Sequence, residues 1–248
     1  MKVSIITITY NSAETVEDTI RSVLSQDYPL IEYIIVDGAS KDGTLHIVNR
    51  YADKIARVIS EPDKGIYDAM NKGVSIATGD VIGILNSDDF YADSTVITDI
   101  VNTLQMASSD ACYADLVYVD KQNTSRIVRS WKSGEYTPGF FLRGWMPPHP
   151  TFFLKRAVYE KYGLYSLELR SSADYELMLR MVHKHGISLS YLPRVITKMR
   201  TGGQSNVTIK NRWKANKEDR LAWKMNGLQP GLFTLVRKPL SKLLQYLK

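Results

Sequence analysis

The first 106 residues alternate between short apolar segments and segments with helical periodicity, and this order constrains the fold more than any other feature. Apolar and β-branched residues dominate the predicted strands at 3–10, 32–37, 56–60 and 80–85. Residues with helical spacing fill the intervening segments at 12–26, 44–52, 66–77 and 94–106. This alternation predicts an α/β fold with a single Rossmann-like, mainly parallel sheet flanked by helices on both faces.

The pattern becomes less regular after Tyr113. Predicted strands lie at 111–120, 127–131, 191–193 and 195–199, and predicted helices at 155–162, 173–183, 211–226 and 232–247. The segment 133–150 is rich in Gly, Pro and aromatic residues and is predicted to be a loop. We therefore expect a small mixed second sheet and C-terminal helices. A length of 248 residues fits one domain with a small appendage.

The net charge of +6 indicates a polyanionic partner such as nucleic acid, an anionic membrane or a phosphate-bearing substrate. Cys112 is the only cysteine, so an intrachain disulfide is impossible and the cysteine content fits a reducing cytoplasm. The N-terminus runs straight into a predicted strand and lacks the features of a signal peptide. No apolar run reaches the roughly 18 residues of a membrane span. The expected location is cytoplasmic.

Polar residues follow each of the four predicted parallel strands. Ligands of such sheets bind at the carboxyl ends of the strands, so these residues are expected to lie along one edge. They occupy positions 9–11, 37–38, 61–65 and 86–89.

Two adjacent carboxylates, Asp88 and Asp89, follow the fourth strand. Neighbouring carboxylates repel each other unless a cation neutralises them. Mg²⁺ and Mn²⁺ prefer oxygen ligands and commonly share them between carboxylates and substrate phosphates. The alternative is that one of the two simply caps the helix that begins near Ser94.

Two further motifs follow the second and third strands. Asp37 can accept hydrogen bonds from a base or a ribose, although the turn after it is also an ordinary helix-capping turn. Lys64 and Lys72 flank a helix whose N-terminus can attract phosphate. Each lysine taken singly is more often a solvated surface group.

The four motifs together resemble family 2 glycosyltransferases of the GT-A fold, of the type that builds bacterial envelope polysaccharides. The resemblance covers about residues 1–205 and is densest at 3–89. It implies that Asp37 contacts the nucleotide base, that Asp89 binds the metal directly and that Asp88 reaches the ribose or a metal-bound water. The implied donor site comprises Thr9, Tyr10, Asn11, Asp37, Asp63, Lys64, Asn71, Lys72, Ser87, Asp88 and Arg200.

The resemblance continues in the second half of the chain. It implies that Asp174 is the catalytic base, that His149 lines the acceptor side and that Arg200 begins a segment closing over the donor diphosphate. The alternatives are a carboxylate at a helix N-terminus, a structural loop histidine and a glycine turn without a ligand. The implied arrangement is a GT-A catalytic domain over 1–205 and a basic helical extension over 206–248.

The sequence departs from the family pattern at two positions. Gly38 stands where many relatives have a second Asp, and Met70 stands where many have Arg. The loss of that arginine removes one usual donor contact, which Lys72 or Lys64 can replace. The chain also lacks the QxxRW-type motif of processive synthases, so the addition of single sugars is expected.

The expected reaction is an inverting, metal-dependent transfer of a hexosyl or hexosaminyl group from a nucleotide diphosphate donor to an acceptor hydroxyl. Mn²⁺ or Mg²⁺ is the expected cofactor, a UDP-sugar is the first candidate donor, and a saccharide or lipid-linked saccharide is the expected acceptor. Uracil, guanine and thymine donors all occur among relatives. A sugar-phosphate nucleotidyltransferase and a non-catalytic sugar-nucleotide-binding protein are the alternatives. Nucleic acid is not an expected partner.

The last segment carries a leucine-rich helical stripe with basic residues beside it. The stripe comprises Leu232, Leu235, Val236, Leu240, Leu243, Leu244 and Leu247. A basic amphipathic helix is typical of a segment that lies on an anionic membrane, here the inner face of the cytoplasmic membrane. The alternatives are packing on the catalytic domain or against a second subunit of a homodimer.

Overall fold

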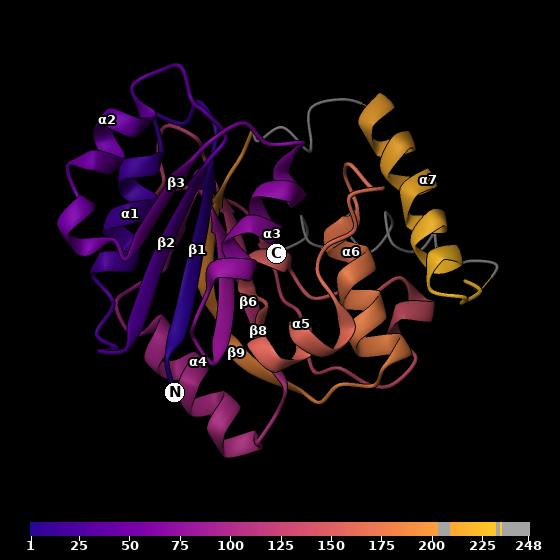
Figure 1. The fold of residues 1–248 in the computed structure, drawn as a ribbon. Helices are drawn as coiled ribbons and strands as arrows, with labels where there is room; N and C mark the ends of the chain where they lie inside the picture. Colours follow the sequence, from indigo (N-terminus) through magenta and orange to yellow (C-terminus); the bar gives the residue numbers. More distant parts are fainter. Residues whose placement is uncertain (203–208, 232–233, 235–248) are drawn as a thin grey trace.

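The protein is described by a computed structural model that covers residues 1–202, 209–231 and 234. Its core is a nine-stranded sheet with strand order β3-β2-β1-β4-β8-β6-β9-β5, and β7 pairs with β6 beside this path (Figure 1). The α/β architecture expected from the sequence, a sheet with helices on both faces, is confirmed.

Four parallel strands form the N-terminal half of the sheet. They are β1 (Val3–Thr9), β2 (Ile31–Asp37), β3 (Arg57–Ser60) and β4 (Val81–Asn86). Thr9 lies opposite Asp37, and Ile8 lies opposite Asn86, so the carboxyl ends of these strands meet at one edge. The polar residues after the strands therefore gather there, as the sequence predicts.

Helices cover both faces of this half. They are α1 (Val16–Leu24), α2 (Thr44–Asn49), the short 3₁₀ turn η1 (Ala52–Lys54), α3 (Ile66–Ile76) and α4 (Val96–Ala107). One apolar cluster joins α1, α2 and α4 to the sheet, and a second cluster contains α3. Both faces of β1, β2 and β4 are buried, which explains their continuous apolar sequences, whereas the edge strand β3 is mostly exposed.

The remaining strands extend the same sheet. They are β5 (Asp89–Tyr91), β6 (Ala111–Val119), β7 (Ile127–Trp131), β8 (Phe153–Lys155) and β9 (Leu189–Arg200). The sequence predicted a small mixed second sheet, and these strands do pair in both orientations, but β8 pairs antiparallel with β4 and makes them part of the one sheet. Gly83 permits this junction, because a Cβ atom there would lie only 2.4 Å from Phe153 Cε1.

The long strand β9 differs from the two extended pieces expected around Pro193. It runs parallel to β6, and the register shifts where Ala114 pairs with Leu192 and Asp115 pairs with Val195. Proline lacks the N–H that a regular ladder needs, and a bulge accommodates it. The strand therefore continues to Arg200 and carries that residue to the edge where β5 lies.

The helical elements of the second half cover the face that carries α3. They are η2 (Phe140–Arg143), η3 (His149–Thr151), α5 (Arg156–Tyr162), α6 (Ala173–Met178), the π-helical turn η4 (Leu179–Lys184) and α7 (Ile209–Met225). Thus the predicted loop at 133–150 includes short 3₁₀ turns.

Helix α7 lies beside α6 at the end of the molecule opposite α1 and α2 (Figure 1). Its Trp223 is buried and belongs to the same apolar cluster as α6. The boundary expected near residue 205 and the leucine stripe at 232–247 lie outside the described residues. Among the residues that are described, no helix combines the length and apolar character needed to cross a bilayer.

Candidate active site

Two loops at the carboxyl edge are fastened to each other. The Asn11 N–H donates to Ser40 Oγ at 2.8 Å, and the Lys41 N–H donates to Asn11 Oδ1 at 2.8 Å. Asn11 and Ala39 both adopt positive φ angles, of 48° and 59°. This arrangement leaves Tyr10 at the loop surface with 55% of its area exposed, where its ring is available to a planar ligand.

Asp37 is fully buried at the end of β2. Its carboxylate accepts hydrogen bonds from the Ser40 N–H at 3.0 Å, from Ser60 Oγ at 2.7 Å and from Ser40 Oγ. Asp37 therefore anchors the β2–α2 loop, whichever ligand the loop meets. Gly38 lies beside it, and a Cβ atom there would lie 2.8 Å from Asp63 Oδ2. The departure from the family pattern at Gly38 thus leaves room for the Asp63 carboxylate.

The Asp88–Asp89 pair is poorly neutralised. Asp89 is fully buried, and its Oδ2 accepts one hydrogen bond from Asn86 Nδ2 at 3.1 Å, while its Oδ1 has no partner among the described residues. Burial, reinforced by the adjacent Asp88 charge, raises the pKa of Asp89 well above its ordinary value. Burial likewise raises the pKa of Asp88.

Neither carboxylate caps the following helix, so that alternative is wrong. Asp89 begins strand β5, and α4 starts only at Val96. The turn before α4 is instead closed by Asp93, whose Oδ1 accepts the Thr95 N–H at 3.0 Å.

Arg200 stands against the same pair. Its guanidinium donates to the Asp88 carbonyl oxygen at 2.9 Å, forms an ion pair with Asp18 and lies 4.8 Å from the centre of the Phe90 ring. Only 7% of Arg200 is exposed. The positive charge of Arg200 opposes the effect of burial on the pKa of Asp88, so it stabilises the ionised form of that carboxylate. These contacts place Arg200 beside the acidic pair as a fixed group.

The donor atoms at this edge suit a hard divalent cation. Thr9 Oγ1 and Asn86 Oδ1 are also buried without a hydrogen-bond partner in the described part of the chain. Across those same residues no group of three or more His, Cys, Asp or Glu side chains is placed to hold a metal. Two carboxylates alone match the Mg²⁺ or Mn²⁺ sites that are completed by water and substrate phosphates.

The two lysines expected near the donor have different surroundings. Lys72 Nζ lies 2.6 Å from Asp63 Oδ1, 2.9 Å from Glu61 Oε1 and 3.7 Å from Asp68 Oδ2. Burial alone would lower the pKa of Lys72, but Asp63 and Glu61 raise it above its ordinary value. Its charge is thus already neutralised, whereas the side chain of Lys64 is exposed at the turn before α3.

A second cluster surrounds Asp174, in the first turn of α6. Tyr67 Oη donates to Asp174 Oδ1 at 3.1 Å, and the Tyr67 ring stacks on Tyr165 with centroids 5.9 Å apart. Tyr165 Oη in turn lies 2.9 Å from His149 Nε2. Burial lowers the pKa of His149 even though Asp174 opposes the effect, so the ring is neutral at pH 7. His149 and Asp174 therefore belong to one cluster.

Helix α3 supplies two residues to this second cluster. Its first turn carries Tyr67, and its middle carries Asn71, whose Oδ1 and Nδ2 bind the backbone N–H and carbonyl of Tyr165, each at 2.9 Å. Asn71, expected to bind the donor, thus has its amide occupied by Tyr165. The sequence reasoning did not single out Tyr67 or Tyr165, although Tyr67 lies inside the motif it used.

Residues 4–163 match the family model described as glycosyl transferase family 2. This chain belongs to glycosyl transferase family 2. Among the relatives of this family 2 enzyme, an uncharacterized glycosyltransferase of Mycobacterium tuberculosis is 32% identical over 180 residues, which are 72% of this chain and 68% of the relative. A PGL/p-HBAD biosynthesis glycosyltransferase of Mycobacterium bovis is 28% identical over 83% of this chain and 80% of its own length. A Bacillus subtilis glycosyltransferase named for teichuronic acid biosynthesis is 42% identical over a shorter segment, 35% of this chain and 36% of the relative.

Solved structures share the fold of this family 2 enzyme. Staphylococcus aureus TarS residues 1–349, in complex with UDP-GlcNAc, match with a TM-score of 0.71 at 19% identity, over 96% of this chain and 69% of that one. A mannosyltransferase of Pyrobaculum calidifontis, in complex with GDP-Man and Mn²⁺, matches with a TM-score of 0.69 at 20% identity, over 96% and 68%. Family membership decides against the nucleotidyltransferase and the non-catalytic alternatives.

Proposed function

We propose that this glycosyltransferase is inverting and metal-dependent and adds one hexosyl or hexosaminyl group to an acceptor hydroxyl. The observation that carries the proposal is the Asp88–Asp89 pair, in which Asp89 is buried with an unpartnered oxygen, together with a separate cluster that holds another carboxylate, Asp174. The pair suits a cation and a diphosphate, and Asp174 suits a proton acceptor.

The donor would occupy the carboxyl edge of the sheet. Asp89, with Asp88 beside it, would hold a divalent cation, which when bound offsets the charge that develops on the diphosphate leaving group. Tyr10 is exposed for contact with the base. Of Lys64 and Lys72, Lys64 is the one whose side chain is exposed and can reach the diphosphate. A UDP-sugar is the first candidate because TarS binds UDP-GlcNAc, and GDP-mannose is the second because the mannosyltransferase binds it.

Asp174 would act on the acceptor. Its carboxylate accepts the proton of the acceptor hydroxyl while that oxygen bonds to the anomeric carbon and the bond from this carbon to the diphosphate breaks. The nucleoside diphosphate departs with the bonding electrons, and attack opposite to it inverts the anomeric configuration. Tyr67 orients Asp174 through its 3.1 Å hydrogen bond, and neutral His149 lies beside this cluster on the acceptor side.

The names of the relatives support an acceptor in envelope glycoconjugate synthesis, such as a saccharide or lipid-linked saccharide. We place the reaction in the cytoplasm, with 1–205 as the catalytic domain and 206–248 as a basic extension that contacts the anionic inner face of the membrane. The net charge of +6 and the leucine-rich stripe with basic residues beside it after Gln229 support this contact. Co-sedimentation with phosphatidylglycerol vesicles should be lost when the chain ends at Gln229, and equal sedimentation of both forms would contradict it.

The reaction itself is tested by a donor screen. UDP-, GDP- and dTDP-sugars are each incubated with the protein and Mn²⁺, with or without EDTA, and release of the nucleoside diphosphate is measured. We expect one donor class to be turned over, and only with the metal present. Undiminished turnover in EDTA would contradict metal dependence, and retention of the donor's anomeric configuration in the product would contradict inversion.

A further inference from the structure

Helix α7 makes polar contacts on both sides of Asp174. Glu218 Oε2 accepts the backbone N–H groups of Arg170 at 3.1 Å and Ser171 at 2.7 Å, just before α6 begins. Trp223 Nε1 donates to the hydroxyl of Tyr175 at 2.9 Å, one residue after Asp174. These contacts fix both the entry to α6 and its first turn.

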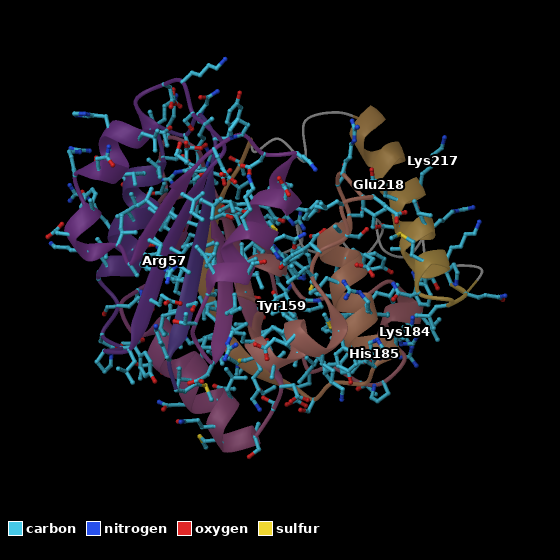
Figure 2. The ribbon with its side chains drawn as sticks, viewed as in Figure 1. Arg57, Tyr159, Lys184, His185, Lys217 and Glu218 are labelled. Carbon is cyan, nitrogen blue, oxygen red and sulfur yellow. The ribbon has the colours of Figure 1, made fainter. Side chains whose placement is uncertain are left out.

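The Glu218 contact lies just before α6. Ser172 occupies the N-cap position of this helix, so Arg170 and Ser171, whose N–H groups bind Glu218, belong to the segment that leads into it. A carboxylate near the start of a helix also interacts favourably with the helix dipole. Figure 2 shows Glu218 on the side of α7 that faces the domain, while the neighbouring Lys217 points outward. The glutamate therefore acts from a separate helix on the segment that leads into Asp174.

A third contact comes from Asn226, the residue directly after α7, and leads toward the segment before Tyr165. Asn226 is buried, and its Nδ2 donates to Glu176 Oε1 at 3.0 Å. The same carboxylate pairs with Arg180, which donates to the carbonyl oxygens of Tyr162, Gly163 and Leu164. These carbonyls immediately precede Tyr165, whose ring stacks on the Tyr67 that binds Asp174. The end of α7 thus reaches the segment before Tyr165 indirectly, through Glu176 and Arg180.

We infer that α7 contributes to the active site and that Glu218 is a positioning residue for Asp174. Since the carboxylate must stand at the acceptor oxygen to remove its proton, loosening the segment 170–171 lowers turnover without changing how the nucleotide binds at the carboxyl edge of the sheet. This inference rests on the proposed role of Asp174 as the base. It also assigns to the C-terminal extension a function that does not depend on a membrane.

The test uses the full chain and the sugar nucleotide selected by the donor screen. Glu218→Ala should lower kcat roughly 10-fold or more, because small displacements of a catalytic group are costly. Affinity for the nucleoside diphosphate with Mn²⁺ should stay within about twofold. Glu218→Gln keeps an oxygen that accepts both N–H groups, so it should restore kcat to near the normal value. Lys217→Ala is the matched control and should behave as the unaltered enzyme.

A double variant separates this inference from the proposed function. If Glu218 acts through Asp174, adding Glu218→Ala to Asp174→Asn should cause little further loss of kcat. A full additional loss, or a Glu218→Ala enzyme with normal kcat, would overturn the inference even if Asp174→Asn is inactive. Normal turnover by Asp174→Asn would instead remove the proposed base. Equal thermal midpoints of the Glu218 variants exclude general unfolding as the cause.

Discussion

A buried carboxylate lies at each of the two edges of the parallel sheet, and the two differ in how completely they are hydrogen-bonded. Glu32, near the start of β2, accepts hydrogen bonds from Ser4 Oγ, from the N–H and Oγ1 of Thr78 and from Lys2 Nζ. Asp89, after the end of β4, accepts one from Asn86 and keeps an unpartnered oxygen. Burial alone would raise the pKa of either carboxyl group. At Glu32 its hydrogen bonds lower the pKa to about 2, whereas the pKa of Asp89 is raised.

This difference separates a carboxylate that completes the fold from one that needs something outside the chain. A buried charge is stable when its hydrogen-bonding capacity is filled, as at Glu32. A charge left partly unfilled costs stability, and such groups concentrate where a ligand or an ion completes them. The carboxyl edge combines this unfilled state with the strand ends at which open α/β sheets bind ligands.

The largest effect is expected for Asp89→Ala. Removal of the proposed cation ligand should abolish transfer and the metal-dependent part of nucleotide binding, as measured by product formation and by calorimetry with and without Mn²⁺. The thermal midpoint of the free protein should not fall, because the substitution removes an unpaired buried charge. Unchanged metal-dependent affinity would remove Asp89 from the site, and a large loss of stability would make it a structural group like Glu32.

Asp174→Asn should lower turnover roughly 10²–10⁴-fold while leaving nucleotide affinity nearly unchanged, because a general base acts on the acceptor in the transition state. In its hydrogen bonding Asp174 is intermediate between Glu32 and Asp89, since Tyr67 donates one hydrogen bond to its carboxylate. Single-turnover rates and nucleotide titrations measure the two quantities separately. Near-normal turnover would reduce Asp174 to a carboxylate at a helix N-terminus.

Binding of a nucleotide and a metal ion should supply partners for the unpartnered oxygens at the carboxyl edge of the sheet. A nucleoside diphosphate with Mn²⁺, at about a hundredfold excess over its dissociation constant, should stabilise the protein by about 2.7 kcal/mol. The shift is read from thermal unfolding and should disappear in the Asp89 variant. An equal shift produced by the nucleotide without any divalent metal would show that the unfilled oxygens are not completed by a cation.

Glu32→Gln should have the smallest effect and should spare activity. Since the folded-state pKa of Glu32, about 2, lies below its ordinary value of 4.5, its contribution to stability is present above pH 4.5 and is lost as the pH falls toward 2. The substitution should therefore cost about 2 kcal/mol at pH 7 and much less near pH 2. Urea unfolding at the two pH values measures this. A loss of turnover in the folded variant would contradict the comparison between the two edges.

Much of the candidate site was predictable because its clues are local. Asp37, Asp63 and Asp88–Asp89 follow strands that the apolar pattern reveals, and parallel strands bring their ends together. The partners of these groups were not predictable. Lys72 lies among Glu61, Asp63 and Asp68, and Arg200 lies against Asp88 and Asp18, so two cations expected at the diphosphate already have anionic partners.

The sequence by itself determined the order of strands and helices, the edge where the candidate residues gather and the family, because these depend on periodicity and on short motifs. Tertiary structure alone decided that β8 joins the two halves into one sheet, that Tyr67 binds Asp174 and that Glu218 of α7 holds the segment before it. These contacts join residues 107 and 47 positions apart in the last two cases. Their formation depends on how helices pack on the sheet, and packing depends on shape and burial that no local pattern encodes.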